Sequence, residues 1–267
     1  MKIKKGLAPV AGSKMRYVAF GRGEKPLVLI PGLLDGLSTV DTKARSLARE
    51  HAALARDYKV YIFSRRDGLP RGFTIRDMAA DQAEAMRALG LTRAAVIGVS
   101  QGGMIAQFLA AGYPELVEKL VLTVTAPYAN DLILAGVKAR AACAERRDLR
   151  AILTDSAEKA YTEKRLKRLR PFFPLLALVP GPRDYGRFLA NTDAILGFDA
   201  RGVLGDITCP TLIIGGGRDA TVGAEGSFEL HEGIPGSELF VYPELGHAAF
   251  QEAPDFAERV LAFLKKA

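Results

Sequence analysis

The chain has 267 residues, of which 49% are hydrophobic and 25% charged, and its 37 Lys and Arg outnumber its 30 Asp and Glu. This composition excludes an intrinsically disordered chain, and the length allows one large domain or two small ones. The net charge of +7 leaves an anionic partner open, because only the distribution of charge can indicate one. No stretch approaches the roughly 20 apolar residues of a membrane-spanning helix, and the N-terminus lacks the apolar region of a signal peptide. We therefore expect a cytoplasmic protein without integral membrane association.

The first 126 residues alternate between strand-like and helix-like segments. Short apolar runs rich in Val and Ile are typical of strands that are buried on both faces of a parallel sheet. Apolar side chains at helical spacing from Ile75 to Leu89 predict an amphipathic helix, with Thr74 and Asp77 as a capping box and Gly90 at its end. The predicted strands of this part are Met15–Phe20, Pro26–Ile30, Lys59–Phe63, Ala94–Val99 and Leu120–Thr125.

The interval from residue 128 to residue 199 interrupts this alternation. It is rich in Leu, Phe and Ala and contains several prolines but no convincing strand, which favours a helical insertion. Further strands are predicted at Thr211–Gly215 and Glu238–Tyr242, before a terminal helix from about Phe256 to Leu264. The repeated β-α pattern predicts an α/β fold with a mostly parallel central sheet flanked by helices. We divide it into a core domain of residues 1–127 and 200–267 and an inserted cap of residues 128–199.

The cysteines and glycines indicate neither a metal site nor a cofactor. Cys143 and Cys209 lie far apart and belong to no C-x-x-C motif, so we expect two buried, reduced thiols. The Gly215–Gly217 run ends a strand without the Lys-Ser/Thr pair of a phosphate-binding loop. We therefore expect no cofactor and no metal.

Residues Gly98–Gly103 carry the strongest motif in the chain. They read Gly-Val-Ser-Gln-Gly-Gly, directly after a predicted strand and before a nearly all-apolar helix. G-x-S-x-G in this context is typical of a nucleophile elbow, a sharp turn that exposes one serine at a helix N-terminus. A side chain at Gly98 or Gly102 would collide with the neighbouring helix or strand. Ser100 is therefore the predicted nucleophile, the alternative being a glycine-rich turn that only packs.

A serine nucleophile needs a general base, and the chain has three histidines. His51 and His231 lie in helix-like surface segments, and we expect both to be solvated. His247 follows the last predicted strand, at the sheet edge where α/β proteins assemble their sites, and is the predicted base. Asp219 follows the preceding strand and is predicted to orient His247, although either residue could be an ordinary loop residue. The other position considered for the acid, within Thr123–Ala126, holds no carboxylate.

The chain order of these three residues is Ser, Asp, His, which is the order of the α/β-hydrolases. Together with the early Leu27–Gly32 segment, the motifs resemble the small cap-bearing bacterial serine esterases of the α/β-hydrolase superfamily, over nearly the whole chain. The resemblance implies an oxyanion hole made by the backbone N–H groups of Leu33 and Gln101. Members usually carry His-Gly after the early strand, whereas this chain has Pro31-Gly32 and lacks that hydrogen-bonding side chain.

A serine at the elbow distinguishes the chain from dehalogenases and epoxide hydrolases of the superfamily, which use an aspartate there. The resemblance instead implies acyl chemistry, and we predict a carboxylesterase for small-molecule esters with short to medium apolar acyl groups. Two alternatives remain: a C–C bond or enol-lactone hydrolase with the same triad, and a ligand receptor or signalling protein on this fold. No recognised motif supports nucleic-acid binding, and the oligomeric state is not predicted.

The predicted cap carries most of the net charge. Residues 138–170 contain eleven Lys and Arg against five Asp and Glu, a net charge of +6. We expect a solvated face there, the alternative being a surface that attracts anionic substrates or a membrane. The apolar side chains of the insertion are expected mostly to form the core of the cap and its contact with the main domain, with a few lining an acyl pocket. They are Leu132, Ile133, Leu134, Phe172, Phe173, Leu175, Leu176, Leu178, Val179, Phe188 and Leu189.

Overall fold

The computed structural model describes residues 2–70 and 72–266. Met1, Arg71 and Ala267, which fall within the predicted core domain, lie outside the described residues. The described strands form one sheet in the order β1-β2-β4-β3-β5-β6-β7-β8. Their bounds are β1 (Lys4–Val10), β2 (Ser13–Phe20), β3 (Pro26–Ile30), β4 (Lys59–Phe63), β5 (Ala94–Val99), β6 (Val117–Thr123), β7 (Thr211–Gly216) and β8 (Glu238–Tyr242).

The sheet is mostly parallel, as predicted. β1 pairs with β2 and β2 with β4 in antiparallel fashion, whereas every pairing from β4 through β8 is parallel. The prediction of strands from continuous apolar runs is confirmed, because every residue of the central strand β5 is buried. The prediction missed β1, an edge strand with a Gly, a Pro and exposed lysines, and placed the end of β6 two residues too late.

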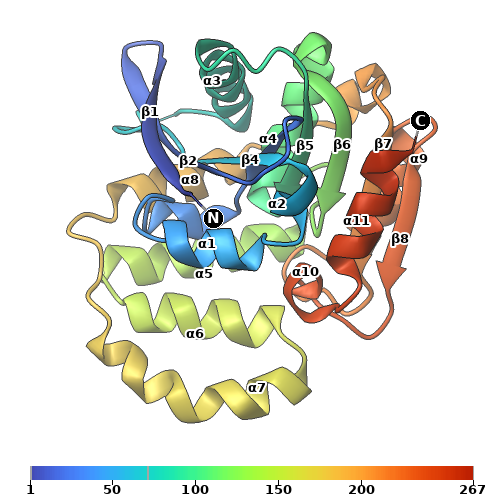
Figure 1. Ribbon diagram of the computed structural model, residues 1–267. Helices are drawn as coiled ribbons and strands as arrows, with labels where there is room; N and C mark the ends of the chain where they lie inside the picture. Colours follow the sequence, from blue (N-terminus) through green and yellow to red (C-terminus); the bar gives the residue numbers. More distant parts are fainter. Residues whose placement is uncertain (1, 71, 267) are drawn as a thin grey trace.

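Helices cover both faces of the sheet (Figure 1). One face packs against α3, α4 and α9, and the other against α1, α2, α10 and α11. The predicted capping box opens α3, where the Asp77 N–H donates to Thr74 Oγ1 over 3.1 Å and the Thr74 N–H donates to Asp77 Oδ2 over 2.8 Å. The helices are α1 (Ala44–Glu50), α2 (Leu54–Asp57), α3 (Ile75–Ala88), α4 (Gln101–Gly112), α9 (Glu225–Gly233), α10 (Ala249–Glu252) and α11 (Phe256–Lys265), with short 3₁₀ helices η1 (Leu33–Gly36), η2 (Pro114–Leu116) and η4 (Arg201–Asp206).

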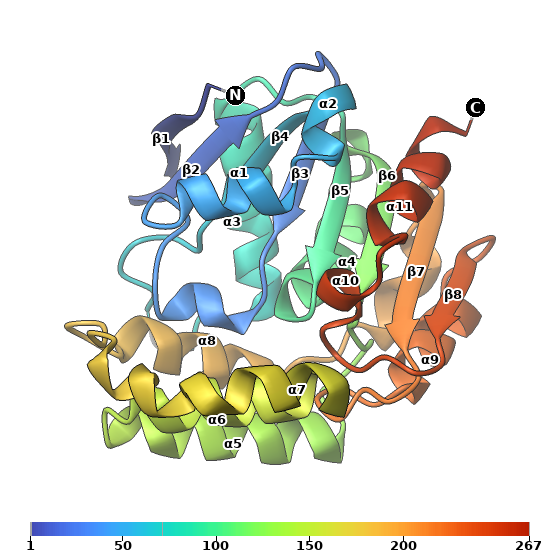
Figure 2. The same ribbon diagram turned by 60° about the horizontal axis from the view of Figure 1, so that its bottom comes forward.

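The remaining helices form a layer across the carboxyl ends of the strands (Figure 2). They are α5 (Asp131–Glu145), α6 (Leu149–Ala160), α7 (Glu163–Leu169), the 3₁₀ helix η3 (Arg170–Leu178) and α8 (Gly186–Leu196). The chain enters and leaves this layer at one place, where an isolated β-bridge joins Tyr128 to Asp199. We propose on this basis that residues 128–199 are the cap, and the layer is called the cap below.

The burial of the apolar cap residues differs from the prediction. Phe188 is fully buried and Ile133 nearly so, but η3 contains no buried residue. Phe172 is 62% exposed and Leu178 79% exposed. The expectation that these side chains form the core of the cap is therefore wrong for most of η3, whose side chains are largely exposed. Leu132, Leu175 and Val179 are exposed as well.

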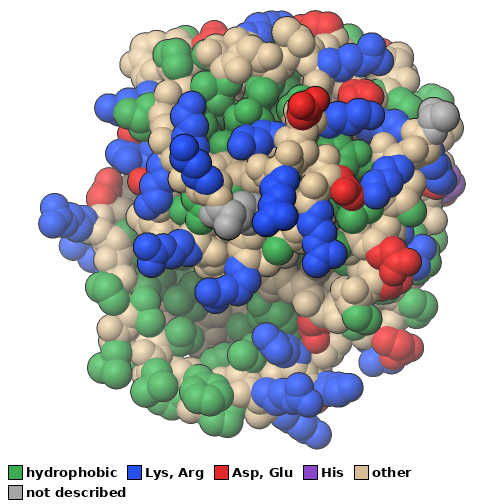
Figure 3. Space-filling view, viewed as in Figure 1, with side chains coloured by type: hydrophobic (Ala, Val, Ile, Leu, Met, Phe, Trp, Pro, Cys, Tyr) green, Lys and Arg blue, Asp and Glu red, His purple; other side chains and the backbone are tan. Residues whose placement is uncertain are grey.

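The basic residues of the cap lie on its surface. Figure 3, in the view of Figure 1, shows Lys and Arg gathered at the lower right of the cap and hydrophobic side chains at its lower left. In the described part of the chain, none of Lys164, Arg165, Lys167 and Arg168 of α7 belongs to an ion pair, and all four are exposed. Arg170 differs, because it pairs with Glu158 and Glu163.

Two further expectations concern the cysteines and the membrane. Cys143 and Cys209 are both free, as expected, but each is partly exposed and not buried. Burial nevertheless raises the pKa of the Cys209 thiol. Among the described residues, the structure contains no helix with the length and apolar character needed to span a membrane.

Candidate active site

Ser100 lies in the turn between β5 and α4, and the turn has the strain of a nucleophile elbow. Its φ of 54° and ψ of −121° place a non-glycine residue in a sparsely populated region, which costs about 1–3 kcal/mol. The Ser100 carbonyl accepts a hydrogen bond from Thr125 Oγ1 at 2.8 Å, and the Ser100 N–H donates to Thr123 O at 2.9 Å. These contacts hold the serine at the start of α4, where the helix N-terminus favours developing negative charge.

The glycines around Ser100 are required by close packing, as the motif predicts. A Cβ at Gly98 would lie 2.6 Å from both the Gly102 carbonyl oxygen and the Gly103 Cα, inside α4. A Cβ at Gly102 would overlap the backbone carbonyl of Ile30 at the end of β3. The elbow therefore fits between a helix and a strand only when both positions lack side chains.

His247 and Asp219 complete a continuous chain of hydrogen bonds with Ser100. His247 Nε2 lies 2.9 Å from Ser100 Oγ, and His247 Nδ1 lies 2.8 Å from Asp219 Oδ2. Because a carboxylate only accepts, Nδ1 carries the proton in this arrangement and Nε2 is free to accept from the serine hydroxyl. The other carboxylate oxygen, Oδ1, accepts from the backbone N–H groups of Thr221 at 2.8 Å and Val222 at 2.9 Å.

Asp219 follows β7 and His247 follows β8, so both loops reach Ser100 from the carboxyl edge of the same sheet. The Asp219 side chain is 1% exposed and the His247 side chain 13% exposed. The structure thus brings together the three residues that the chain order singled out. A buried carboxylate with three donors has a fixed orientation, and it fixes the orientation of the imidazole in turn.

Leu33 and Gln101 have free backbone donors beside Ser100. Leu33 is the first residue of η1 and Gln101 the first residue of α4, so neither N–H has an acceptor within its own helix. Gly32 brings the η1 segment close, since a Cβ there would lie 3.3 Å from Ser100 Cβ. This arrangement suits an oxyanion hole, which remains a proposal for these two residues.

Ser100 and His247 line a cavity of about 470 Å³ beneath the cap. Its wall is mostly apolar, with Leu47 on the side of α1 and Leu153 and Ala157 on the side of α6. Figure 3 shows the surface hollowed between these two helices. A cavity of this size fits a small organic substrate whose reacting carbonyl lies at Ser100.

His51 belongs to this cavity, which corrects the expectation that it is solvated. It is partly buried in the wall, and burial lowers its pKa, an effect that Glu50 opposes. Beside it, Gln251 accepts from Tyr161 Oη at 2.6 Å and donates to Glu50 Oε1 at 3.1 Å, which links the cap to α1. No motif marks these residues in the sequence. His231 lies on the surface of α9, as expected, with Nδ1 2.9 Å from Ser237 Oγ.

Sequence reasoning also missed a cluster of buried polar side chains behind η1, the segment that carries Leu33. Arg65 and Asp35 are 3% and 7% exposed, and Arg187 of α8 pairs with Asp35. One signal was available: Arg65 comes two residues after the end of β4, so it lies at the same sheet edge as Ser100. Among the described residues, no group of three or more His, Cys, Asp or Glu is arranged to hold a metal ion.

The fold and the site together define an α/β-hydrolase. A family model described as the alpha/beta hydrolase fold matches residues 25–254, and the chain belongs to this family.

Individual relatives agree with this assignment. The chain is 28% identical over 244 residues to serine hydrolase BPHL of Mus musculus, covering 89% of this chain and 78% of the relative. It is 30% identical over 224 residues to the putative carbamate hydrolase RutD of Cronobacter sakazakii, covering 77% and 80% of the two chains. Among solved structures, the enol-lactonase from Burkholderia xenovorans LB400 superposes with a TM-score of 0.81 at 23% identity, covering 98% of this chain and all of that one.

Proposed function

We propose that this hydrolase is a serine carboxylesterase that cleaves short to medium acyl esters. The observation that carries the proposal is the unbroken series of hydrogen bonds from Ser100 Oγ through His247 to Asp219 at the base of the cavity. A serine alone is a weak nucleophile, and a base at hydrogen-bond distance with an oriented ring supplies its activation.

The geometry supports a two-stage reaction. Ser100 Oγ attacks the ester carbonyl while His247 Nε2 takes its proton, and the Leu33 and Gln101 N–H groups stabilise the oxyanion. The imidazolium then protonates the departing alcohol, which leaves an acyl-enzyme on Ser100. Water, deprotonated by His247, attacks the acyl-enzyme, and the serine regains its proton as the carboxylic acid leaves.

The apolar wall of the cavity supports a preference for an apolar acyl group. Each methylene of an acyl chain gains about 0.8 kcal/mol when it is transferred from water to such a wall. Of the charged side chains that line the cavity, Arg140 pairs with Asp155 and Asp35 pairs with Arg187, and the others are Lys43 and Glu50. The cavity volume of about 470 Å³ limits the acyl group to short or medium length.

The test is a series of p-nitrophenyl esters from acetate to decanoate, measured with the parent protein and with Ser100→Ala. We expect multiple turnovers by the parent, with a maximum in the short to medium range, and loss of turnover in the variant. Normal turnover by Ser100→Ala would overturn the proposal.

The same assay separates the alternatives that share the fold. An enol-lactone or a vinylogous diketone turned over much faster than every ester would assign the triad to lactone or C–C bond hydrolysis. A single stoichiometric burst, together with a ligand-dependent rise in unfolding temperature, would instead indicate a receptor.

A further inference from the structure

Arg65 is a buried cation at the carboxyl end of β4. Because β4 lies beside β3, this end reaches the segment that carries Pro31 and Leu33. A buried guanidinium is costly unless its N–H groups find acceptors. Burial lowers the pKa of Arg65 to about 10, and Asp35 opposes this decrease, so the side chain is still protonated at neutral pH.

The guanidinium contacts both segments that supply the oxyanion donors. Arg65 Nη2 donates to the Pro31 carbonyl at 2.5 Å and to Gln101 Oε1 at 3.1 Å. Pro31 precedes Leu33 by two residues, and Gln101 carries the second backbone donor itself. One planar, rigid side chain therefore spans the two turns whose N–H groups must converge on a single oxygen atom.

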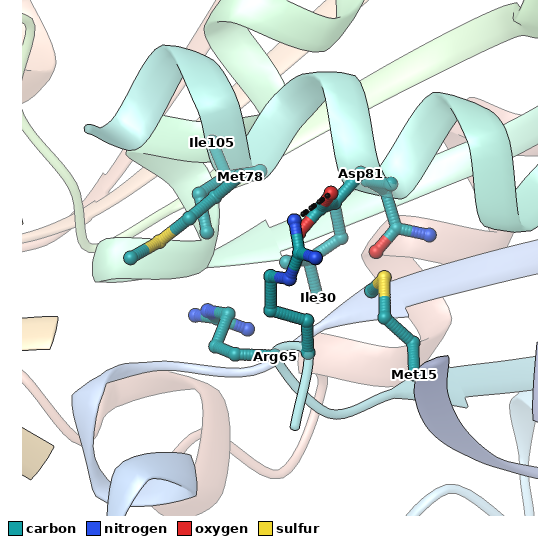
Figure 4. Close-up of a pocket in the computed structure, with 8 residues that line it drawn as sticks. Met15, Ile30, Arg65, Met78, Asp81 and Ile105 are labelled. Atoms are coloured by element: carbon teal, nitrogen blue, oxygen red, sulfur yellow. Dashed lines mark hydrogen bonds and ion pairs between the residues drawn. The ribbon is translucent and has the colours of Figure 1, made fainter. Parts of the chain in front are cut away.

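The neighbouring arginine makes different contacts. Arg66 Nη1 lies 3.3 Å from Asp81 Oδ1, the interaction drawn as a dashed line in Figure 4. The labelled Arg65 side chain in that view points away from Asp81. The two consecutive arginines are thus both largely buried, but only Arg65 reaches the oxyanion segments.

Asp35, in η1, is the carboxylate of this cluster. Its Oδ1 accepts from Ser64 Oγ at 2.7 Å, and its Oδ2 accepts from the Arg65 N–H at 2.9 Å. Oδ2 also accepts from Arg187 Nη2 at 2.5 Å, and the Asp35 carbonyl accepts from Arg187 Nη1 at 2.9 Å. A carboxylate with this many donors holds η1, and hence Leu33, in one position.

Helix α8 of the cap contacts the cluster at several points. Arg187 extends from α8 to Asp35 and also to the Arg65 carbonyl, at 3.2 Å. Farther along α8, the Asn191 carbonyl accepts from Gln101 Nε2 at 3.0 Å. The backbones of η1 and α8 also approach closely, because a Cβ at Gly36 would lie 2.9 Å from the Phe188 Cα.

We propose that Arg65 is the positioning residue of the oxyanion hole and that Asp35 and Arg187 make helix α8 part of the same rigid unit. This inference rests on the proposed function, since it assigns a role in the chemistry at Ser100.

The physical consequence is specific to the transition state. The oxyanion exists only as the ester carbonyl becomes tetrahedral, so donors displaced by a fraction of an ångström weaken transition-state binding more than substrate binding. Loss of Arg65 should therefore lower kcat and leave KM nearly unchanged. If Arg65 had only a structural role, its replacement would change the stability without lowering kcat selectively over KM.

The test compares Arg65→Met and Arg65→Lys with the matched control Arg66→Met, measuring kcat, KM and unfolding temperature. A second readout is the inhibition constant of an aliphatic trifluoromethyl ketone, which forms a tetrahedral adduct with a nucleophilic serine. We expect Arg65→Met to lower kcat about 100-fold, with KM within about threefold and the ketone weakened in parallel with kcat. Arg65→Lys should recover part of the loss, and Arg187→Met should lower kcat about tenfold.

Several outcomes would overturn the proposal. If Arg65→Met and Arg66→Met lower kcat equally, or if Arg65→Met raises KM at unchanged kcat, the positioning role is excluded. If Arg65→Met does not fold, Arg65→Lys decides by the same two readouts. Ser100→Ala is measured alongside: turnover in that variant overturns the proposed function, whereas its inactivity combined with a normal kcat of Arg65→Met overturns only the role of Arg65.

Discussion

Two parts of the cap are attached to the protein in different ways. Helix α8, the inner cap, is joined to the core by buried polar contacts of Arg187 and Asn191 with the segments around Ser100. Residues 149–178, the outer cap, contact the core near one junction, where the Thr162 hydroxyl donates to Glu252 Oε1 at 2.7 Å and the Ala248 N–H donates to Ala160 O at 2.9 Å.

The difference separates two tasks within one insertion. The inner cap forms hydrogen bonds with the segments that carry Leu33 and Gln101, so changes there should alter the rate of the chemical step. The outer cap forms a wall of the cavity through α6 and an exposed surface through α7 and η3, so changes there should alter substrate range or nothing at all. This division predicts effects of different size, which are greatest at Asp219 and least at the basic surface of α7.

The largest effect is expected at Asp219, which follows β7 and belongs to neither part of the cap. Asp219→Asn replaces an obligatory acceptor with a group that also donates, so His247 loses its fixed tautomer. We expect kcat for p-nitrophenyl butyrate to fall about 10⁴-fold with little change in KM. Asp206→Asn, at the exposed end of η4, is the control and should be unaffected. A loss of less than tenfold in Asp219→Asn would mean that another residue serves as the acid.

Two phenylalanines compare the stability contributions of the two parts. Phe188 of the inner cap is fully buried, and Phe172 of the outer cap is 62% exposed. Phe188→Ala should lower the free energy of unfolding by about 3–5 kcal/mol because it leaves a cavity. Phe172→Ala should change it by no more than about 0.5 kcal/mol. Urea titration of both variants measures this, and equal losses would show that η3 is packed in solution.

Leu153 tests the outer cap as a wall of the cavity. Leu153→Trp narrows the space opposite Ser100, so kcat/KM for an octanoate ester should fall about tenfold while acetate hydrolysis stays within about twofold. Leu153→Met, which conserves volume, is the control and should retain the parent preference. Parallel losses for acetate and octanoate would show that Leu153, like the inner cap, affects the chemical step and not the substrate range.

The smallest effect is expected at the basic surface of α7. Replacing Lys164, Arg165, Lys167 and Arg168 with Gln removes four exposed charges. At physiological ionic strength, hydrolysis of neutral and anionic esters should stay within about twofold of the parent. Vesicle sedimentation with anionic lipid should be equally unchanged. A selective loss for anionic esters or for vesicles would support the alternative that this surface attracts anions or a membrane.

Sequence reasoning worked where one physical requirement dominates. Gly98 and Gly102 are required by contacts of the elbow with α4 and β3, so the motif, the strand before it and the helix after it were predicted together. The positions of Asp219 and His247 followed from the rule that parallel strands direct their carboxyl ends to one edge. These inferences depend on local packing and topology, which leave clear patterns in a sequence.

Sequence reasoning failed where the burial of a residue depends on which distant elements pack against one another. The apolar residues of η3 look like core residues, but none of them is buried in the fold. His51 has the charged neighbours of a surface residue, yet it lies in the wall of a cavity that α6 also lines. The Arg65 cluster draws its partners from three separate segments, so neither its burial nor its contacts follow from any local pattern.

The central claim is that Ser100 is the acylated nucleophile, and intact-protein mass spectrometry tests it directly. The protein is mixed with a slowly deacylated ester, such as p-nitrophenyl pivalate, quenched in acid within the first turnover and then digested. We expect one added acyl mass per chain, located on the peptide that contains Ser100, and none in Ser100→Ala. An acyl group on another residue, or turnover of the ester by Ser100→Ala, would contradict it.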